Sequence, residues 1–185
     1  MMAKEMTDRL KNALTVFTTK CEVLLRQDPH EDAITDEFKT FLKSEFKEWE
    51  YSISHNYDKR IVNNELVKKQ TQFLIERLPK LPANIDPNSP TIIKEILPDL
   101  IFHDLESSDH NFMIIEIKKT TNKKKADREM DLLKLEVTTS FDLRYDYGVF
   151  IDFATGDEYS KVNPVSFKLF ANGKIIHEEK VELEQ

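Results

Sequence analysis

Two apolar segments joined by a short polar stretch constrain the fold of this 185-residue chain more than any other feature. They cover residues 91–104 and 111–119, and the polar stretch 106–110 separates them. Short apolar runs bounded by turn-forming residues are typical of strands that are buried on both faces. The sequence therefore predicts a β-hairpin at the centre of the folded core.

Hydrophobic periodicity predicts further elements around this hairpin. Apolar residues at helical spacing predict helices over 7–27, from residue 29 to about 46, over 61–78 and over 126–140. An alternating pattern predicts a strand over 48–55, a mostly apolar run predicts another over 145–153, and four prolines within 79–90 predict a loop. Asn172-Gly173, between two further apolar stretches, predicts a C-terminal hairpin.

Two local features complete this prediction. Asp28, Pro29 and Glu31 have the spacing of a capping box at the start of the second helix. His103 follows the first apolar run and His110 falls in the polar stretch, and both are expected to face solvent.

The glycine and cysteine content excludes several classes of site. The three glycines, Gly148, Gly156 and Gly173, lie far apart, which excludes a glycine-rich dinucleotide turn, a P-loop and a nucleophile elbow. The single Cys21 excludes a disulfide framework and a thiolate zinc site, and it suits a reducing compartment. No apolar run has the length of a membrane span and no signal-peptide core is present, so we expect a cytoplasmic protein without membrane contact.

A glutamate and a lysine interrupt the second apolar segment. Glu116 and Lys118 lie two residues apart, so their side chains leave the same face of the predicted strand. An ionised carboxylate among apolar residues is costly unless a cation or hydrogen bonds compensate it. An exposed strand face with a salt-bridged pair is the alternative, but the flanking residues are too apolar for it. The pair is therefore a candidate for a functional site.

The first segment carries a carboxylate that this strand would bring close to Glu116. Asp99 follows Pro98, and a symmetric hairpin places it opposite Glu116. Two carboxylates so close repel each other, and a divalent cation with hard oxygen ligands, Mg²⁺ or Mn²⁺, resolves the repulsion. Such an ion supports hydrolysis of phosphodiester bonds, and the Lys118 ammonium would orient the water or stabilise the developing charge.

These residues resemble the signature of the PD-(D/E)XK phosphodiesterase superfamily. Pro98-Asp99 is followed after sixteen residues by Glu116-Ile117-Lys118, and the resemblance covers about residues 31–153. It implies an α/β, restriction-endonuclease-like fold in which helices flank a central mixed β-sheet. It also implies that Asp99, Glu116 and the carbonyl group of Ile117 bind the metal while Lys118 serves catalysis.

Glu31 and the stretch 131–135 extend this resemblance. Many members of the superfamily add an acidic ligand from the first core helix, and Glu31 is the matching residue, although its place in the capping box explains it equally well. The stretch 131–135 is similar to the helix that follows the catalytic strand in small bacterial members. Asp131 and Lys134 either form a surface pair or face the site.

We expect one domain of 185 residues, made of an N-terminal helix (1–28), a nuclease-like core (29–153) and an extra C-terminal β-hairpin (154–185). The insertion over 61–90 and the C-terminal hairpin depart from the compact pattern of the superfamily. Oligomeric state stays open, with a homodimer the commonest solution.

The net charge of −7 gives no indication of nucleic acid, but its distribution does. Residues 118–134 carry a net charge of +4 directly after the proposed catalytic lysine. Such a run is either a solvated loop or a set of phosphate contacts. The candidate contacts to nucleic acid, DNA before RNA, are Lys119, Lys123, Lys124, Lys125 and Lys134.

Three hypotheses follow. The first is a Mg²⁺- or Mn²⁺-dependent nuclease that uses Asp99, Glu116 and Lys118. The second is a catalytically inactive module of the same fold that binds nucleic acid or protein. The third is a structural protein with a fortuitous motif, in which Asp99 and Glu116 would lie far apart.

Overall fold

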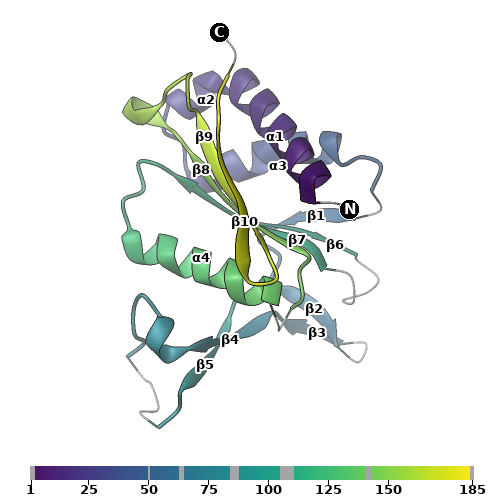
Figure 1. The fold of residues 1–185 in the computed structure, drawn as a ribbon, viewed down its shortest axis with the longest axis vertical. Coiled ribbons are helices and arrows are strands. Elements are labelled where there is room, and N and C mark those ends of the chain that lie inside the picture. Colours follow the sequence, from purple (N-terminus) through teal and green to yellow (C-terminus); the bar gives the residue numbers. More distant parts are fainter. Residues whose placement is uncertain are drawn as a thin grey trace.

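A mixed β-sheet covered by helices on both faces forms the centre of the molecule (Figure 1). The computed structural model describes residues 3–49, 51–62, 65–83, 88–104, 111–140 and 143–183. Within these residues the sheet has six strands in the order β1-β6-β7-β8-β9-β10, and two separate two-stranded sheets, β2-β3 and β4-β5, lie beside it. In the central sheet only β7 and β8 run parallel, so the sheet is mostly antiparallel.

The bounds of the elements are as follows. The helices are α1 (Ala3–Lys20), α2 (Glu22–Arg26), α3 (Glu31–Glu45) and α4 (Lys125–Ser140), and two short 3₁₀ turns are η1 (Ile75–Arg77) and η2 (Gly156–Glu158). The strands are β1 (Ser52–His55), β2 (Lys59–Val62), β3 (Glu65–Lys68), β4 (Gln70–Leu74), β5 (Thr91–Glu95), β6 (Leu100–His103), β7 (Asn111–Lys119), β8 (Tyr147–Phe153), β9 (Val165–Ala171) and β10 (Lys174–Val181).

Strand β7 is buried on both faces, as its apolar sequence predicts. Every residue from Phe112 to Lys118 is buried. Ile115 and Ile117 pack into the apolar cluster under α1 and α3, whereas Ile114 packs into the cluster under α4. Because side chains alternate along a strand, Glu116 and Lys118 share the α4 face with Ile114.

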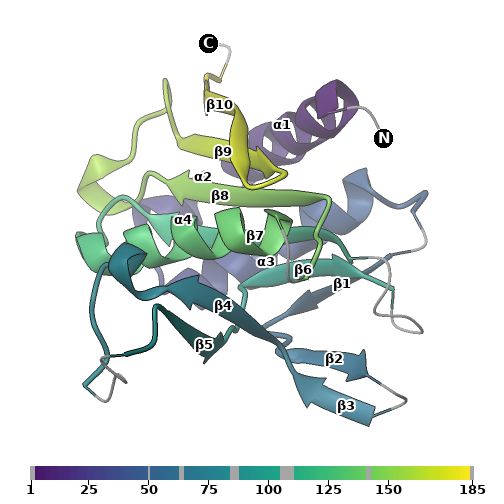
Figure 2. The same cartoon turned by 60° about the horizontal axis from the view of Figure 1, so that its bottom comes forward.

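The connection from β7 to β8 passes through α4, which lies across the sheet (Figure 2). Parallel strands need such a crossover, and it brings the carboxyl ends of β7 and β8 side by side. Lys118 is paired with Asp152 in this ladder. The charged end of β7, a central strand, therefore lies where the carboxyl ends of β7 and β8 meet, beneath α4.

The predicted central hairpin is confirmed for the part of the chain that the structure describes. Strands β6 and β7 pair antiparallel, with Leu100 opposite Ile115 and Ile101 opposite Ile114. Extending this register by one residue places Asp99 opposite Glu116, as the symmetric hairpin requires. The predicted turn over 106–110, His110 included, lies outside the described residues.

The helix predicted over 61–78 is wrong. The segment forms β2, β3 and β4 and the short turn η1. In β4 exposure alternates with a period of two: Thr71 and Phe73 are buried, while Gln72 and Leu74 are exposed. Pairing with β5 fixes this conformation, so that tertiary contacts override the weak helical stripe. Residues 91–104 are consequently two strands, β5 and β6, in different sheets.

The capping box at the start of the second helix is also wrong. Helix α3 begins at Glu31, and its N-cap His30 makes no side-chain capping bond. Asp28 adopts a left-handed backbone conformation with φ of 51°. Its carboxylate is used elsewhere, because it accepts hydrogen bonds from Lys119, Thr121 and Thr155.

Other predicted elements agree with the structure to within a few residues. The first predicted helix is interrupted at Cys21, the strand predicted over 48–55 is limited to Ser52–His55, and α4 and β8 lie where they were expected. The C-terminal hairpin turns at Asn172 and Gly173, which have φ of 50° and 72°. This hairpin extends the central sheet, because β9 pairs with β8. None of the described helices is long and apolar enough to cross a membrane.

His103 is buried, contrary to the expectation that it faces solvent. Its side chain is 5% exposed, its Nε2 atom lies 3.0 Å from the Ser54 hydroxyl group and its ring packs on Tyr57. Burial, and then the charge of Lys69, lowers the pKa of His103 from 6.5 to about 4, and Asp104 opposes this shift. The folded protein therefore holds the imidazole neutral at pH 5 to 6.

The first prediction tests the strand that replaces the predicted helix. Phe73 is fully buried and Leu74 is 45% exposed, although they are neighbours. Phe73→Ala is expected to lower the free energy of unfolding by about 3–5 kcal/mol, because it leaves a cavity. Leu74→Ala should cost less than about 1 kcal/mol. Urea denaturation measures both, and equal losses would contradict the alternation in β4.

The second prediction concerns pH. The unfolded chain protonates His103 below about pH 6.5, whereas the folded chain does so only near pH 4. The free energy of unfolding should therefore fall by up to about 3 kcal/mol between these pH values through this residue. His103→Gln removes this contribution, and its stability should fall less than that of the wild type in urea denaturation from pH 7 to 4.5. His30→Gln, at a side chain that is 85% exposed, should keep the wild-type profile.

Candidate functional site

Asp99 binds the backbone of the strand that carries Glu116 and Lys118. Its Oδ2 atom accepts a hydrogen bond of 2.6 Å from the N–H group of Ile117. Asp99 precedes the first residue of β6, so its side chain continues the ladder where the backbone pairing ends. The two halves of the predicted motif, Pro98-Asp99 and Glu116-Ile117-Lys118, therefore meet at the carboxyl end of β7.

Five side chains form a row of alternating charge beside this contact, which we call the charge row: Glu116, Lys134, Asp131, Lys118 and Glu31. The Nζ atom of Lys134 lies 2.8 Å from Oε1 of Glu116 and 2.9 Å from Oδ1 of Asp131. The Nζ atom of Lys118 lies 2.9 Å from Oδ2 of Asp131 and 3.5 Å from Oε2 of Glu31. Asp131 thus bridges the two ammonium groups, one with each oxygen atom.

The sequence leaves open whether Asp131 and Lys134 form a surface pair or face the site, and their location decides this. Their side chains are only 11% and 12% exposed, and both face the site from α4. The two residues lie one helical turn apart, so a rigid helix fixes their spacing. They do not form a surface pair. The sequence signal for this position was the spacing of Asp131 and Lys134, three residues apart on a predicted helix.

Burial and mutual repulsion raise the pKa values of the two carboxyl groups of the motif. Burial raises the pKa of Glu116 to about 8, with further increases from Asp99 and Asp131 and opposition from Lys134. Burial also raises the pKa of Asp99, although its hydrogen bond from Ile117 opposes this. Burial therefore outweighs the neighbouring lysines at both carboxyl groups.

The two lysines show the opposite response. Burial lowers the pKa of Lys118 and of Lys134, but the neighbouring carboxylates outweigh it and raise both pKa values above the ordinary range. Asp131 contributes to both, Asp99 and Glu31 to Lys118, and Glu116 to Lys134. Both side chains are thus ammonium ions at neutral pH.

The site carries more negative than positive charge. The charge row and Asp99 together contain four carboxylates and two ammonium groups, so the fully ionised site has a net charge of −2. Oδ1 of Asp99 and Oε2 of Glu116 have no hydrogen bond from the described residues. Two free carboxylate oxygens in a site short of positive charge fit Mg²⁺ or Mn²⁺, which prefer such ligands.

The remaining predicted ligands lie close by but are already bonded. The carbonyl oxygen of Ile117 accepts a hydrogen bond of 3.2 Å from Lys118, and Glu31 accepts one of 2.9 Å from Asn122. Across the described part of the chain, no three side chains of the types His, Cys, Asp and Glu converge as a metal-binding group. The ligands of a metal ion bound here would therefore be the carboxylates of Asp99 and Glu116, together with backbone or water oxygens.

The predicted nucleic-acid contacts fall into two groups, two lysines that are paired with carboxylates near the site and three that are exposed. Lys119 binds the carboxylate of Asp28 at 3.0 Å, and Lys134 is held in the charge row. Lys123, Lys124 and Lys125 are exposed at the start of α4. These three can reach a ligand without leaving the Asp28 contact or the charge row.

Sequence reasoning did not identify a cluster that holds the site together, here called the Asp28 cluster: Asp28, Lys119, Thr121 and Thr155. Hydrogen bonds of 2.7 Å from each threonine and 3.0 Å from Lys119 converge on one oxygen of Asp28. They lower the pKa of Asp28 to about 2, the two threonines contributing most. The cluster ties the loop before α3 to the ends of β7 and β8. Its members are distant in sequence, so no local pattern predicts it.

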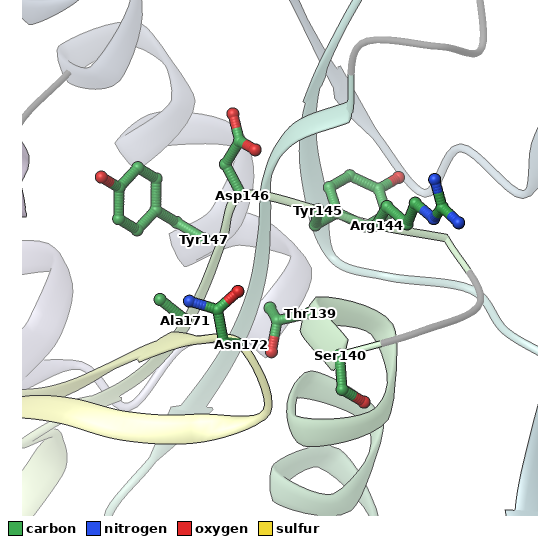
Figure 3. A pocket seen from close by; sticks show the side chains of 8 residues that line it. All are labelled: Thr139, Ser140, Arg144, Tyr145, Asp146, Tyr147, Ala171 and Asn172. Carbon is green, nitrogen blue, oxygen red and sulfur yellow. The ribbon is translucent and has the colours of Figure 1, made fainter.

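A separate polar pocket of about 650 Å³ lies at the other end of α4, where β8 begins (Figure 3). It is lined by Thr139, Ser140, Arg144, Tyr145, Asp146, Tyr147, Ala171 and Asn172. Arg144 and Tyr147 point in opposite directions, so these side chains do not converge on one point (Figure 3). No residue of the predicted site lines this pocket.

Comparisons with known proteins return no match: no family model, no curated protein and no solved structure matches this chain.

Proposed function

We propose that this protein is a Mg²⁺- or Mn²⁺-dependent nuclease with a restriction-endonuclease-like core. The order of elements supports the proposal: α3 is followed by β1, β6 and β7 as antiparallel neighbours, then by the crossover helix α4 and the parallel strand β8. This is the arrangement that the resemblance to the PD-(D/E)XK superfamily implies. The segment from β2 to β5 is an insertion between β1 and β6.

One observation carries the proposal. The carboxylate of Asp99 accepts the hydrogen bond of Ile117, the residue between Glu116 and Lys118. A fortuitous motif does not require its two halves, sixteen residues apart in the chain, to meet in this way. Asp99 also lies close enough to Lys118 for its charge to contribute to the raised pKa of that side chain.

The residues divide the proposed chemistry among them. Asp99, Glu116 and the carbonyl group of Ile117 would hold the metal, which supplies polarisation of the phosphate and acidification of a bound water. Lys118 remains an ammonium ion because Asp131 and Glu31 bind it. It therefore orients the water or stabilises negative charge on the phosphate, and it does not act as a base.

The exposed lysines at the start of α4 support a nucleic-acid substrate. The side chains of Lys123 and Lys125 are 70% and 87% exposed, and the carboxylates near them, Glu158 and Glu129, are themselves solvent-accessible. Such pairs are weak and exchange readily for phosphate groups. Lys119 is the last residue of β7 and lies close in sequence to these lysines. A nucleic-acid backbone bound to them would therefore lie next to the proposed site.

A second candidate is a catalytically inactive module that binds nucleic acid or protein. The observation that favours it is the charge row, in which both lysines and Asp131 already have partners without a metal. Titration with Mn²⁺ separates the two candidates, because the module need not bind the ion.

The third prediction tests the nuclease. The purified protein is expected to cleave plasmid DNA, single-stranded DNA or RNA with MgCl₂ or MnCl₂ and not with EDTA. Asp99→Asn, Glu116→Gln and Lys118→Met should each lower the cleavage rate by about a hundredfold or more. A gel assay of the cleavage rate with thermal melting of each variant measures this.

Lys20→Gln, on the exposed end of α1, serves as the control and should keep full activity. Cleavage that persists in both Glu116→Gln and Lys118→Met, or cleavage in EDTA, would contradict the mechanism. Absence of cleavage of all three substrates together with absence of Mn²⁺ binding would favour the module.

A further inference from the structure

We propose that the ammonium group of Lys134 acts as a fixed second cation, so that the site takes a single divalent metal ion. The inference rests on the proposed function and adds the number of ions. Sites for phosphodiester hydrolysis are built around one or two divalent ions. In this chain a side chain from α4 occupies the place beside Glu116 that a second ion would need.

The first argument is the supply of oxygen ligands. Lys134 occupies Oε1 of Glu116 and Oδ1 of Asp131, and Lys118 occupies the other oxygen of Asp131. Glu31 is shared between Lys118 and Asn122. Of these carboxylates, only Glu116 keeps an oxygen without a partner among the described residues.

Asp99 supplies one more oxygen, Oδ1, that has no partner among the described residues, since its bond to Ile117 uses Oδ2. Asp99 and Glu116 lie opposite each other when the register of β6 and β7 is extended by one residue, so their side chains leave neighbouring positions on the same face of the sheet. Two such oxygens with the carbonyl group of Ile117 suffice for one Mg²⁺, which usually keeps several waters. No further pair of free carboxylate oxygens remains in the charge row for a second ion.

The second argument is charge. With all six groups ionised the site has a net charge of −2, and one divalent cation brings it to zero. A second divalent cation would leave an excess of +2 in a largely buried site. Uncompensated buried charge is strongly unfavourable, so the second ion should be excluded.

The third argument is the fixed position of Lys134. Its side chain is 12% exposed and holds two carboxylates at 2.8 and 2.9 Å. Asp131, one turn earlier on α4, anchors both this ammonium group and that of Lys118. If Lys134 left this position, the carboxylates of Glu116 and Asp131 would lose the cation between them and would repel each other.

The fourth prediction is the number of bound ions. Isothermal titration calorimetry and electron paramagnetic resonance of Mn²⁺ with the metal-free protein should give one ion per chain at the site. Glu116→Gln should lose this ion, which assigns it to the site and excludes weak binding elsewhere on the acidic surface. Two site ions in the wild type would overturn the inference and leave the nuclease standing. Absence of any ion would overturn the proposed function and the inference together.

Substitution of Lys134 tests its role directly. Lys134→Gln frees oxygens of Glu116 and Asp131 and makes the site more negative, so it should bind two Mn²⁺ ions, the first about tenfold more tightly or better. Lys134→Arg keeps the charge and should bind one. Lys20→Gln, at an exposed lysine on α1, should behave as the wild type.

A single ion with unchanged affinity in a folded Lys134→Gln variant would overturn the proposal. Thermal melting establishes whether that variant folds. If it does not fold, the count in the wild type and in Lys134→Arg decides, because two ions in either protein contradict a fixed second cation.

Discussion

The hydrogen bond between the Asp99 carboxylate and the N–H group of Ile117 is the contact on which the arrangement of the site depends. It joins the end of β6 to the charged end of β7 and gives a carboxylate a backbone partner inside the protein. Bonds of this kind to an ionised acceptor are stronger than those between neutral groups. Once this contact fixes the register, Glu116 and Lys118 must face α4, and α4 must then supply opposite charges. Asp131 and Lys134 meet that requirement.

The central hairpin could be predicted because its information is local. Two apolar runs, a short polar stretch and the condition that one face is buried leave little freedom in the register. The prediction that Asp99 lies opposite Glu116 agrees with the pairing of Leu100 with Ile115. The C-terminal hairpin was predictable for the same reason, since Asn172-Gly173 favours the left-handed conformations that its turn adopts.

The predictions that were wrong depended on contacts between distant parts of the chain. Phe73 is buried because β4 pairs with β5, and no pattern within 61–78 indicates that partner. Asp28 has the spacing of a helix cap, but two threonines and a lysine from other loops bind its carboxylate. Likewise the basic run predicts one uniform surface, whereas Lys119 is bound to Asp28 and Lys134 is held by buried carboxylates.

The Asp28 cluster has a consequence for the order in which the protein folds. It joins residues 28, 119, 121 and 155, and the charge row draws on residues 31, 116, 118, 131 and 134. Contacts across such separations form late, because closing long loops costs entropy before the contacts repay it. The bond between Thr155 and Asp28 cannot form until residue 155 has been synthesised, by which time β7, α4 and β8 are also present. The carboxylates and lysines thus come together only within an almost complete sheet.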